Sequence, residues 1–424
     1  MSVLARGRAF VLMFSSAVAA QAVLSATSLV VGLILVRRTS DVDYGFYVLT
    51  VLVVMLTTAT QNSFIQPQVV LRMTSADVAG RADLIGGLYR EQRMLWPVFA
   101  LVATATALAL WWSGHLTDRA LGVALVGSLA VIAAMFREFF RMMLMNYRRS
   151  GVVFGADLVY AALLITGVMA ATFTRWPALV AVCSLGAAAL SGGLVCYVSL
   201  RRMEPWNIHG ERGILLSLVP SGVWTTAGSV THWLFSQGFN FLIAGMLGVA
   251  AVAAVAATRI LIMPVNLLST GIGTLLYPTV AGWLTRHSVK KVLNRQLLIA
   301  GSLALAAVCY FALIWLMRDW LFLHVLKKQV PNRDRLLMLW FAVGILMLLR
   351  DQVVFVLLSR SRFRILTVLT VFSAVVALTT SVLAMRVFGV SGALLGVLCG
   401  EVVNVSGLIL LSVLESRGAA VLPA

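Results

Sequence analysis

The sequence predicts an all-α integral membrane protein, with about twelve transmembrane helices in two six-helix lobes around a central cavity. Of the 424 residues, 61% are hydrophobic and only 11% are charged, a composition that excludes an ordinary soluble domain. The mean hydropathy is +0.98. Apolar stretches of transmembrane length recur along the whole chain, and similar polar patterns recur in its two halves.

The spans follow from hydropathy averaged over about 19 residues. Stretches that can cross a ~30 Å hydrocarbon layer at about 1.5 Å per residue occur at 10–36, 45–70, 95–113, 120–142, 152–173, 178–200, 214–244, 249–281, 297–317, 336–358, 365–387 and 391–414. The first is too long for a signal-peptide core, so we expect it to be retained. Six spans fall in each half, which predicts an N-terminal lobe over 1–207 and a C-terminal lobe over 208–424.

The basic residues predict the orientation of the spans, because cytoplasmic loops of membrane proteins are enriched in Lys and Arg. One side of the predicted membrane collects 21 of them and the other side 10. We therefore expect both termini in the cytoplasm. This topology and contacts with anionic membrane lipids explain the net charge of +18, so no nucleic-acid partner is expected.

One external loop, from Arg318 to Arg335, departs from this trend, because it holds half of the basic residues on its side. It combines the run W-L-F-L at 320–323 with Lys327 and Lys328, which is typical of a segment that lies in the membrane interface. A role in releasing an anionic product is the alternative.

Polar residues inside the spans mark candidate functional positions, because hydrocarbon makes them costly unless they face protein or water. In the seventh span they recur every three or four residues, which predicts one polar face on a helix. These residues are Ser217, Ser221, Thr225, Ser229, His232, Ser236 and Asn240. Such small polar residues also mediate close helix packing, and packing remains the alternative.

Three further spans carry a polar stripe, and together the four form the same hairpin in each half of the chain. The stripes comprise Gln21, Ser25, Ser28 and Gly32 in the first span, Thr50, Thr57, Gln61 and Gln68 in the second, and Arg259, Asn266 and Thr270 in the eighth. Two halves with an even number of spans have the same membrane orientation. We therefore expect the stripes to face each other across a water-filled cleft.

The turn R-R-T-S-D-V-D-Y-G-F-Y at 37–47 resembles the first hairpin of polysaccharide flippases in the multidrug/oligosaccharidyl-lipid/polysaccharide exporter superfamily. Tyr44, Gly45 and Tyr47 match the family's Tyr-Gly-x-Tyr. We expect Gly45 to let the chain turn tightly before the second span.

The second half of the chain matches the family's motifs less well, at 255–261 and 275–281. Arg259 and Pro278 match there, whereas the second Gly-x-Tyr is replaced by Ala253, Ala254 and Val255. The resemblance covers nearly the whole chain in span number and loop length.

This resemblance implies two lobes that rock between inward-open and outward-open states in the inner (plasma) membrane. It also implies a substrate, a lipid-linked oligosaccharide in which pyrophosphate joins the sugars to a polyprenyl lipid. A polysaccharide polymerase and a chain-length regulator are candidate partners.

An anionic pyrophosphate in a low-dielectric cleft needs fixed positive charge. The planar guanidinium of arginine can provide this charge, because it presents several N–H donors to phosphate oxygens. Arg259, about ten residues inside the eighth span, is the first candidate. The predicted substrate-binding residues are Arg259, His232, Asn240, Asn266, Gln21, Gln61, Arg137 and Arg350. Arg137, Arg141 and Arg350 lie nearer the cytoplasmic ends of spans four and ten, where we expect an entry vestibule for the substrate. Contact with lipid headgroups is the alternative, because arginines near an interface commonly extend to them.

Glu401, about ten residues into the last span, must be neutralised or protonated in the bilayer. We expect Glu401 and Asp351 to couple transport to protons or sodium, and a structural hydrogen bond or salt bridge is the alternative for Glu401.

No cofactor is expected. The sequence has no phosphate-cradling loop, its five histidines are dispersed, and its four cysteines lack paired spacing.

Three other functions stay open. A drug or cation exporter of the same superfamily shares the fold, although the first span carries Gln21 and no acidic residue. A lipid-linked peptidoglycan precursor flippase commonly has more spans and a longer chain. A membrane polysaccharide polymerase or ligase characteristically has a large external loop, whereas the largest here, 318–335, is short. We therefore predict a transporter and not an enzyme.

Overall fold

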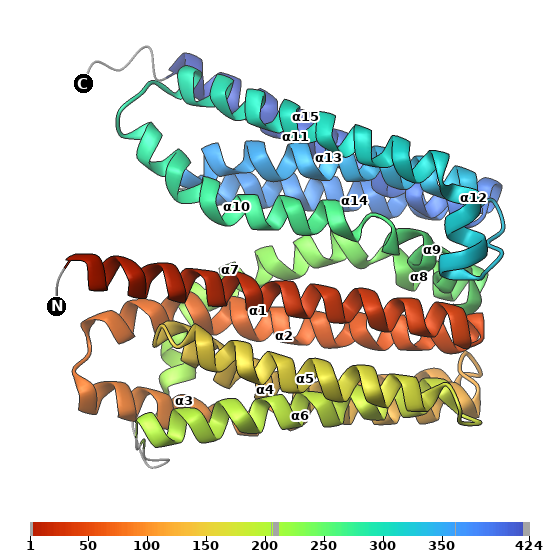
Figure 1. The fold of residues 1–424 in the computed structure, drawn as a ribbon, viewed down its shortest axis with the longest axis horizontal. Coiled ribbons are helices and arrows are strands. Elements are labelled where there is room, and N and C mark those ends of the chain that lie inside the picture. The colour runs from red at the N-terminus through yellow and green to blue at the C-terminus, as the bar shows by residue number, and fades with distance from the viewer. Residues whose placement is uncertain (1–2, 205, 207–211, 361, 419–424) are drawn as a thin grey trace. The chain divides into compact units, whose positions relative to one another are not determined.

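The computed structural model describes residues 3–204, 206, 212–360 and 362–418, and these residues form helices joined by short connections (Figure 1). Among them, ten helices are long and apolar enough to cross a membrane, and a bent helix at 214–237 makes eleven. The predicted all-α membrane fold is confirmed. The chain divides into two compact units, Met1–Val230 (unit 1) and Thr231–Ala424 (unit 2), whereas the lobe limits 1–207 and 208–424 remain a proposal.

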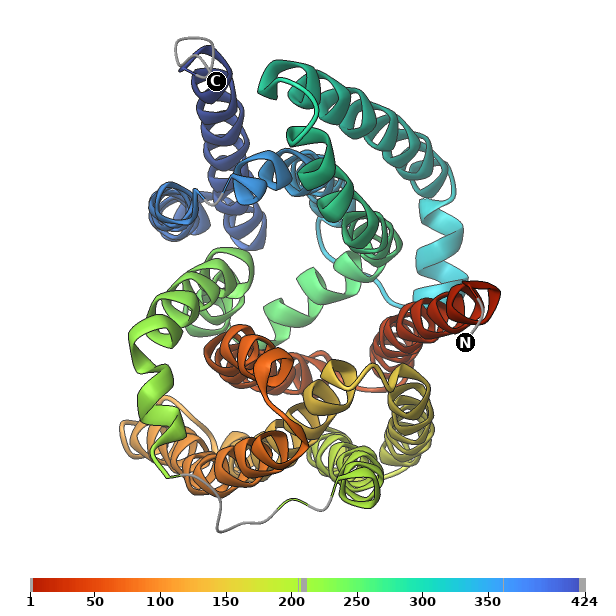
Figure 2. The same ribbon diagram turned by 90° about the vertical axis from the view of Figure 1, so that its left-hand side faces the viewer.

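Unit 1 contains six long helices and the first part of a seventh. They are α1 (Val3–Arg38), α2 (Asp41–Ser75), α3 (Val78–Trp112), α4 (Asp118–Asn146), α5 (Ser150–Ala171), α6 (Pro177–Met203) and α7 (Ile214–Gln237). Figure 2 views them nearly end-on. Side-chain oxygens of Ser40, Asp77 and Thr117 accept backbone N–H groups at the starts of α2, α3 and α4, which explains where these helices begin.

The expectation for Gly45 is wrong. Only Thr39 and Ser40 separate α1 from α2, and Gly45 lies inside α2. Ser40 makes the turn, because its hydroxyl accepts the N–H of Asp43 at 3.1 Å. The Asp43 carboxylate in turn binds Arg119 of α4 at 2.5 Å, so the acidic turn ties two hairpins of unit 1 together.

Unit 2 contains shorter, interrupted helices followed by long ones. They are α8 (Phe239–Leu247), α9 (Val249–Ile260), α10 (Met263–Leu284), α11 (Val289–Leu316), α12 (Arg318–Trp320), the π-helix η1 (Leu321–Leu326), α13 (Arg333–Ser359), α14 (Phe363–Phe388) and α15 (Val390–Gly418). Glycines allow α14 and α15 to pack closely, since a Cβ on Gly392 would lie 2.3 Å from the Ala384 backbone.

The seventh and eighth spans are not the continuous helices that we predicted. Helix α7 bends by 70° between Pro220 and Gly222 and ends at Gln237, and α8 follows after Gly238. The eighth span is broken between α9 and α10 at Leu261 and Ile262. Pro264 near the start of α10 explains this break, because proline lacks the N–H that a continuous helix requires.

Candidate functional site

The breaks in unit 2 place Arg259 beside the end of α7. Its Nη1 atom donates a hydrogen bond of 2.6 Å to Oε1 of Gln237, the last residue of α7. The guanidinium also lies over the ring of Trp340 in α13, 5.5 Å from the ring centre. Two neutral groups from different helices therefore fix the orientation of a half-buried arginine, the predicted first candidate for binding an anion.

Two further hydrogen bonds hold the helix ends around this arginine. Asn240 is buried, and its Nδ2 atom donates to the backbone oxygen of Gln237 at 3.0 Å. The hydroxyl of Tyr310 in α11 donates to the backbone oxygen of Leu261 at 2.9 Å. A carbonyl released at a helix break needs such a donor, because water is scarce in the bilayer. We name Arg259, Gln237, Asn240, Trp340 and Tyr310 the Arg259 site.

A second cluster in unit 2 is charged. Arg350 Nη1 donates to Glu401 Oε1 at 2.6 Å, and Arg350 Nη2 donates to Asp351 Oδ1 at 3.0 Å. The Ser269 hydroxyl donates to Asp351 Oδ2 at 3.0 Å. The cluster thus holds one cation and two carboxylates. Glu401 Oε2 is buried and has no hydrogen-bond partner among the described residues, which leaves an acceptor available for a proton or a cation.

Other predicted residues of unit 2 lie at different depths. His232 in the last part of α7 is exposed, and the charges of Arg350 and Asp351 act on it. Asn266 in α10 is half-buried. The single polar face predicted for the seventh span is wrong for Asn240, because that residue belongs to α8 and is buried. The side chains of Ser221, Gln68 and Thr270 lie outside the described residues.

The predicted glutamines of unit 1 differ in burial. Gln21 in α1 is exposed. Gln61 in α2 is buried, donates to the backbone oxygen of Met135 at 3.0 Å and accepts from Trp96 Nε1 at 2.8 Å. The Gln61 side chain therefore joins α2, α3 and α4.

Arg137 and Arg141 of α4 bind the same carboxylate within unit 1. Arg137 Nη2 donates to Asp157 Oδ1 at 2.5 Å, and Arg141 Nε donates to Asp157 Oδ2 at 3.1 Å. Asp157 itself is completely buried. The Arg137 guanidinium also lies over the ring of Tyr160, 4.0 Å from its centre. Both arginines thus bind one carboxylate on α5 and join it to α4.

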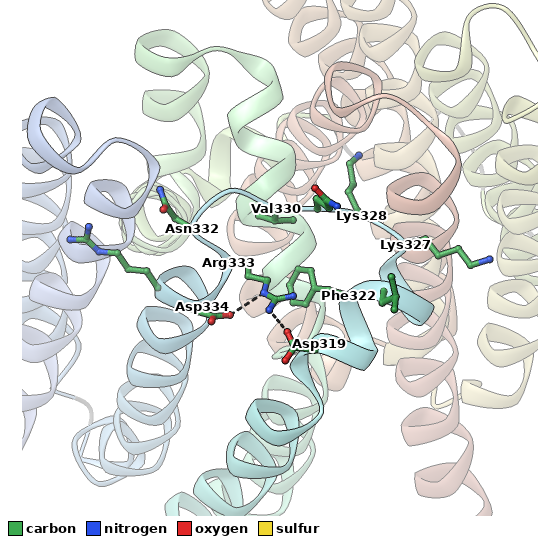
Figure 3. A pocket seen from close by; sticks show the side chains of 11 residues that line it. Asp319, Phe322, Lys327, Lys328, Val330, Asn332, Arg333 and Asp334 are labelled. Carbon is green, nitrogen blue, oxygen red and sulfur yellow. Dashed lines mark hydrogen bonds and ion pairs between the residues drawn. The ribbon is translucent and has the colours of Figure 1, made fainter.

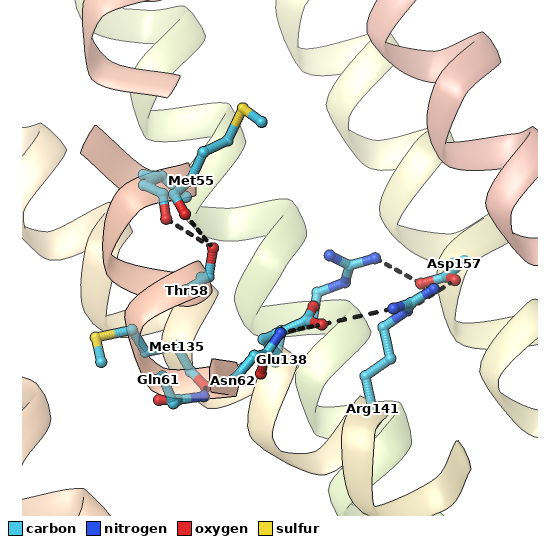
Figure 4. Close-up of polar contacts among 10 residues, drawn as sticks. Met55, Thr58, Gln61, Asn62, Met135, Glu138, Arg141 and Asp157 are labelled. Carbon is cyan, nitrogen blue, oxygen red and sulfur yellow. Dashed lines mark hydrogen bonds and ion pairs between the residues drawn. The ribbon is translucent and has the colours of Figure 1, made fainter. Parts of the chain in front are cut away.

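The same network extends to α2. Glu138 Oε1 lies 3.5 Å from Arg141 Nη1 and accepts a hydrogen bond of 3.0 Å from Asn62 Nδ2 (Figure 4).

Sequence reasoning missed Asp157, although it is the one acidic residue in an apolar stretch at 152–173. It also missed Gln237, Tyr310 and Trp340, whose importance depends on where the helices break.

Comparisons with known proteins identify a shared fold. No family model and no curated protein matches the sequence. The chain is similar to a solved inward-facing MATE family multidrug resistance transporter of the MOP superfamily, with 15% identity, 94% of this chain and 96% of that chain covered, and a TM-score of 0.73. An outward-facing MATE family transporter is also similar, with 14% identity, 97% of this chain and 96% of that chain covered, and a TM-score of 0.65.

The lipid II flippase MurJ in an inward closed conformation is also similar. The identity is 8%, the coverage is 94% of this chain and 88% of that chain, and the TM-score is 0.69. At such low identities these likenesses concern the fold. The chain is a multi-pass membrane protein with the fold of MATE transporters and MurJ.

Proposed function

We propose that this protein is a flippase that moves a lipid-linked oligosaccharide or polysaccharide precursor, carried on polyprenyl pyrophosphate, from the inner to the outer leaflet of the bacterial inner membrane. The single observation that carries the proposal is the Arg259 site, where an arginine is held between two helix ends at the breaks of spans seven and eight. Interrupted helices at membrane depth are typical of substrate sites in transporters.

The chemistry of the site suits a pyrophosphate. An isolated phosphate anion pays a large desolvation penalty in the membrane. A guanidinium offsets this penalty by presenting several N–H donors in one plane. Because Gln237 and Trp340 fix the guanidinium from two sides, Arg259 needs little reorganisation to bind. His232 and Asn266 of unit 2 are the proposed polar contacts for the sugars.

We assign ion coupling to the Arg350 cluster. One arginine faces two carboxylates, Glu401 and Asp351, so the cluster carries an excess negative charge, and its Glu401 carboxylate is buried. A proton or a sodium ion would remove that excess. Arg350 itself therefore serves to hold the two carboxylates, and alternating access would be driven by binding and release of the cation.

The alternative is a drug or cation exporter. The same excess of carboxylates would also attract an organic cation, and MATE multidrug transporters share the fold. For an anionic lipid-linked sugar the Arg259 site is the better fit, because it presents positive charge at a helix break.

Deletion of the gene distinguishes the two functions. We expect a lipid-linked saccharide to accumulate on the cytoplasmic leaflet, together with loss of a surface glycan. No accumulation, an unaltered surface glycan and greater sensitivity to cationic drugs would instead favour the exporter.

A further inference from the structure

An open pocket of about 980 Å³ lies at the connection between α11 and α13 within unit 2. Its wall is formed by α12, by the π-helix η1, by the irregular segment 327–332 and by the start of α13. Figure 3 shows this segment passing above Arg333, which lies between Asp319 and Asp334. The volume lies in the range of sites for small molecules, about 300–1,000 Å³.

The charges that line the pocket are predominantly positive. Four basic residues, Lys327, Lys328, Arg333 and Arg335, accompany two acidic ones, Asp319 and Asp334. Both carboxylates bind Arg333, and Asp334 also lies 3.5 Å from Arg318.

Lys327 and Arg335 stand apart from these acids. The side chains of Lys327 and Lys328 extend away from the Arg333 pairs (Figure 3). Arg335 is exposed, and its guanidinium lies over the ring of Phe388 at 4.8 Å. In the described part of the chain, neither Lys327 nor Arg335 forms an ion pair with a carboxylate. The excess charge at the rim of the pocket is therefore positive and accessible.

The backbone of this connection is unusual. Lys327 has φ of 50° and Asn332 has φ of 54°, so both ends of the irregular segment adopt the left-handed conformation that side chains disfavour. A π-helix immediately precedes it, and such helices occur often at functional sites. Gln329 and Asn332 add amide groups to the lining, which can bind sugar hydroxyls.

Exposed apolar side chains place the pocket at the level of lipid headgroups. Leu316, Trp320 and Leu323 are 79%, 50% and 70% exposed, and they continue the exposed apolar surface of α11 past its end. Trp320 stacks on His324. An apolar surface with an aromatic ring and adjacent lysines is typical of a segment in the membrane interface.

We propose that this pocket binds the phosphate groups of a membrane lipid on the external side of the membrane. The shared chemistry is a phosphate or pyrophosphate ester at headgroup level, held by Lys327 and Arg335. Its source is either the pyrophosphate of the flipped carrier lipid or an ordinary anionic phospholipid. Binding of the carrier-lipid pyrophosphate would rest on the proposed function, whereas binding of an ordinary phospholipid is independent of it.

The test uses the full-length protein in phosphatidylcholine nanodiscs, titrated with geranylgeranyl pyrophosphate. The titration is performed in the Arg259→Ala background, so that the binding measured does not come from the Arg259 site. We expect Lys327→Gln with Arg335→Gln to weaken binding by about tenfold or more, because basic residues near a membrane surface attract anionic groups. Lys290→Gln with Lys291→Gln, two exposed lysines near the start of α11, is the matched control and should bind as before.

Nanodiscs that contain phosphatidylglycerol separate the two lipid sources. If phosphatidylglycerol displaces the pyrophosphate probe, an anionic phospholipid is the ligand. If the probe stays bound, the site prefers the pyrophosphate. Equal affinity of the Lys327/Arg335 double variant and its parent would overturn the proposal. Binding of the probe to the Arg259→Ala parent that does not weaken as the salt concentration is raised would also overturn it, and this measurement needs no substitution in the pocket. Either result leaves the proposed function intact, since that depends on transport by protein with Arg259.

Discussion

Arg350 donates a hydrogen bond of 2.6 Å to Glu401, which joins α13 to α15 across 51 residues of sequence. The adjacent Asp351 accepts a second hydrogen bond from the same guanidinium, although neighbours on a helix do not normally face each other. One arginine thus holds two carboxylates, and this imbalance is the physical basis of the proposed ion coupling.

Replacing Glu401 with Gln should remove the dependence of transport on the pH or sodium gradient while the protein still folds. The substitution keeps the shape of the side chain and removes the excess negative charge. Transport in proteoliposomes would be measured with and without an imposed gradient. Ser373→Ala is the control, because it removes the hydroxyl that binds Asn404 one turn beyond Glu401. An unchanged gradient dependence in Glu401→Gln would assign Glu401 a structural role.

Arg259→Ala should lower the affinity for lipid-linked substrate by about tenfold to a hundredfold, because a hydrogen bond between charged groups contributes about 1.5–3 kcal/mol. Arg259→Lys keeps the charge but loses the planar fork, so an intermediate affinity is expected. Membrane insertion and thermal stability should change little. The Gln237→Glu variant, which places a carboxylate against Arg259, should impair binding in the same direction.

Tyr310→Phe should destabilise unit 2 by about 1–3 kcal/mol, since it leaves the Leu261 carbonyl without its donor in a poorly solvated place. The thermal unfolding midpoint measures this effect. Tyr197→Phe, in the aromatic cluster of unit 1, serves as the matched control and should unfold close to wild type. A Tyr310→Phe protein as stable as the control would mean that water or another group satisfies the break.

Asp157→Asn should destabilise unit 1 by about 3–5 kcal/mol, because it removes the buried carboxylate that Arg137 and the half-buried Arg141 share. Reduced yield in the membrane and a lower unfolding midpoint would report the loss. The double variant Asp157→Leu with Arg137→Met removes both charges of one pair, so it should recover part of the stability. If Asp157→Asn is fully stable, these ion pairs contribute less than their burial suggests.

The predicted orientation can be read from the labelling of introduced cysteines. A membrane-impermeant thiol reagent should label Arg38→Cys and Lys327→Cys from outside intact cells, and Lys290→Cys only after permeabilisation. The four native cysteines would first be replaced by serine. The reverse pattern would invert the topology that the basic residues predict.

The sequence was sufficient to predict the helices and their membrane character, because hydropathy is a local property of the chain. It was insufficient for the helix breaks, since hydropathy averaged over about 19 residues merges neighbouring short helices into one span. Gly238 lies at the break between α7 and α8, and Pro264 lies just after the break between α9 and α10. The sequence also left the partner of Arg137 unpredicted. The structure shows that Asp157 on another helix holds this arginine, a contact between segments that no local pattern encodes.

The central claim is tested most directly by reconstituting the protein in liposomes with a fluorescent oligosaccharide linked to polyprenyl pyrophosphate. Movement of the label between leaflets is followed by its accessibility to a membrane-impermeant quencher. The wild type should move the lipid, Arg259→Ala should be close to empty liposomes, and Arg259→Lys should lie between them. Wild-type rates in Arg259→Ala, or a wild type no faster than empty liposomes, would contradict the account.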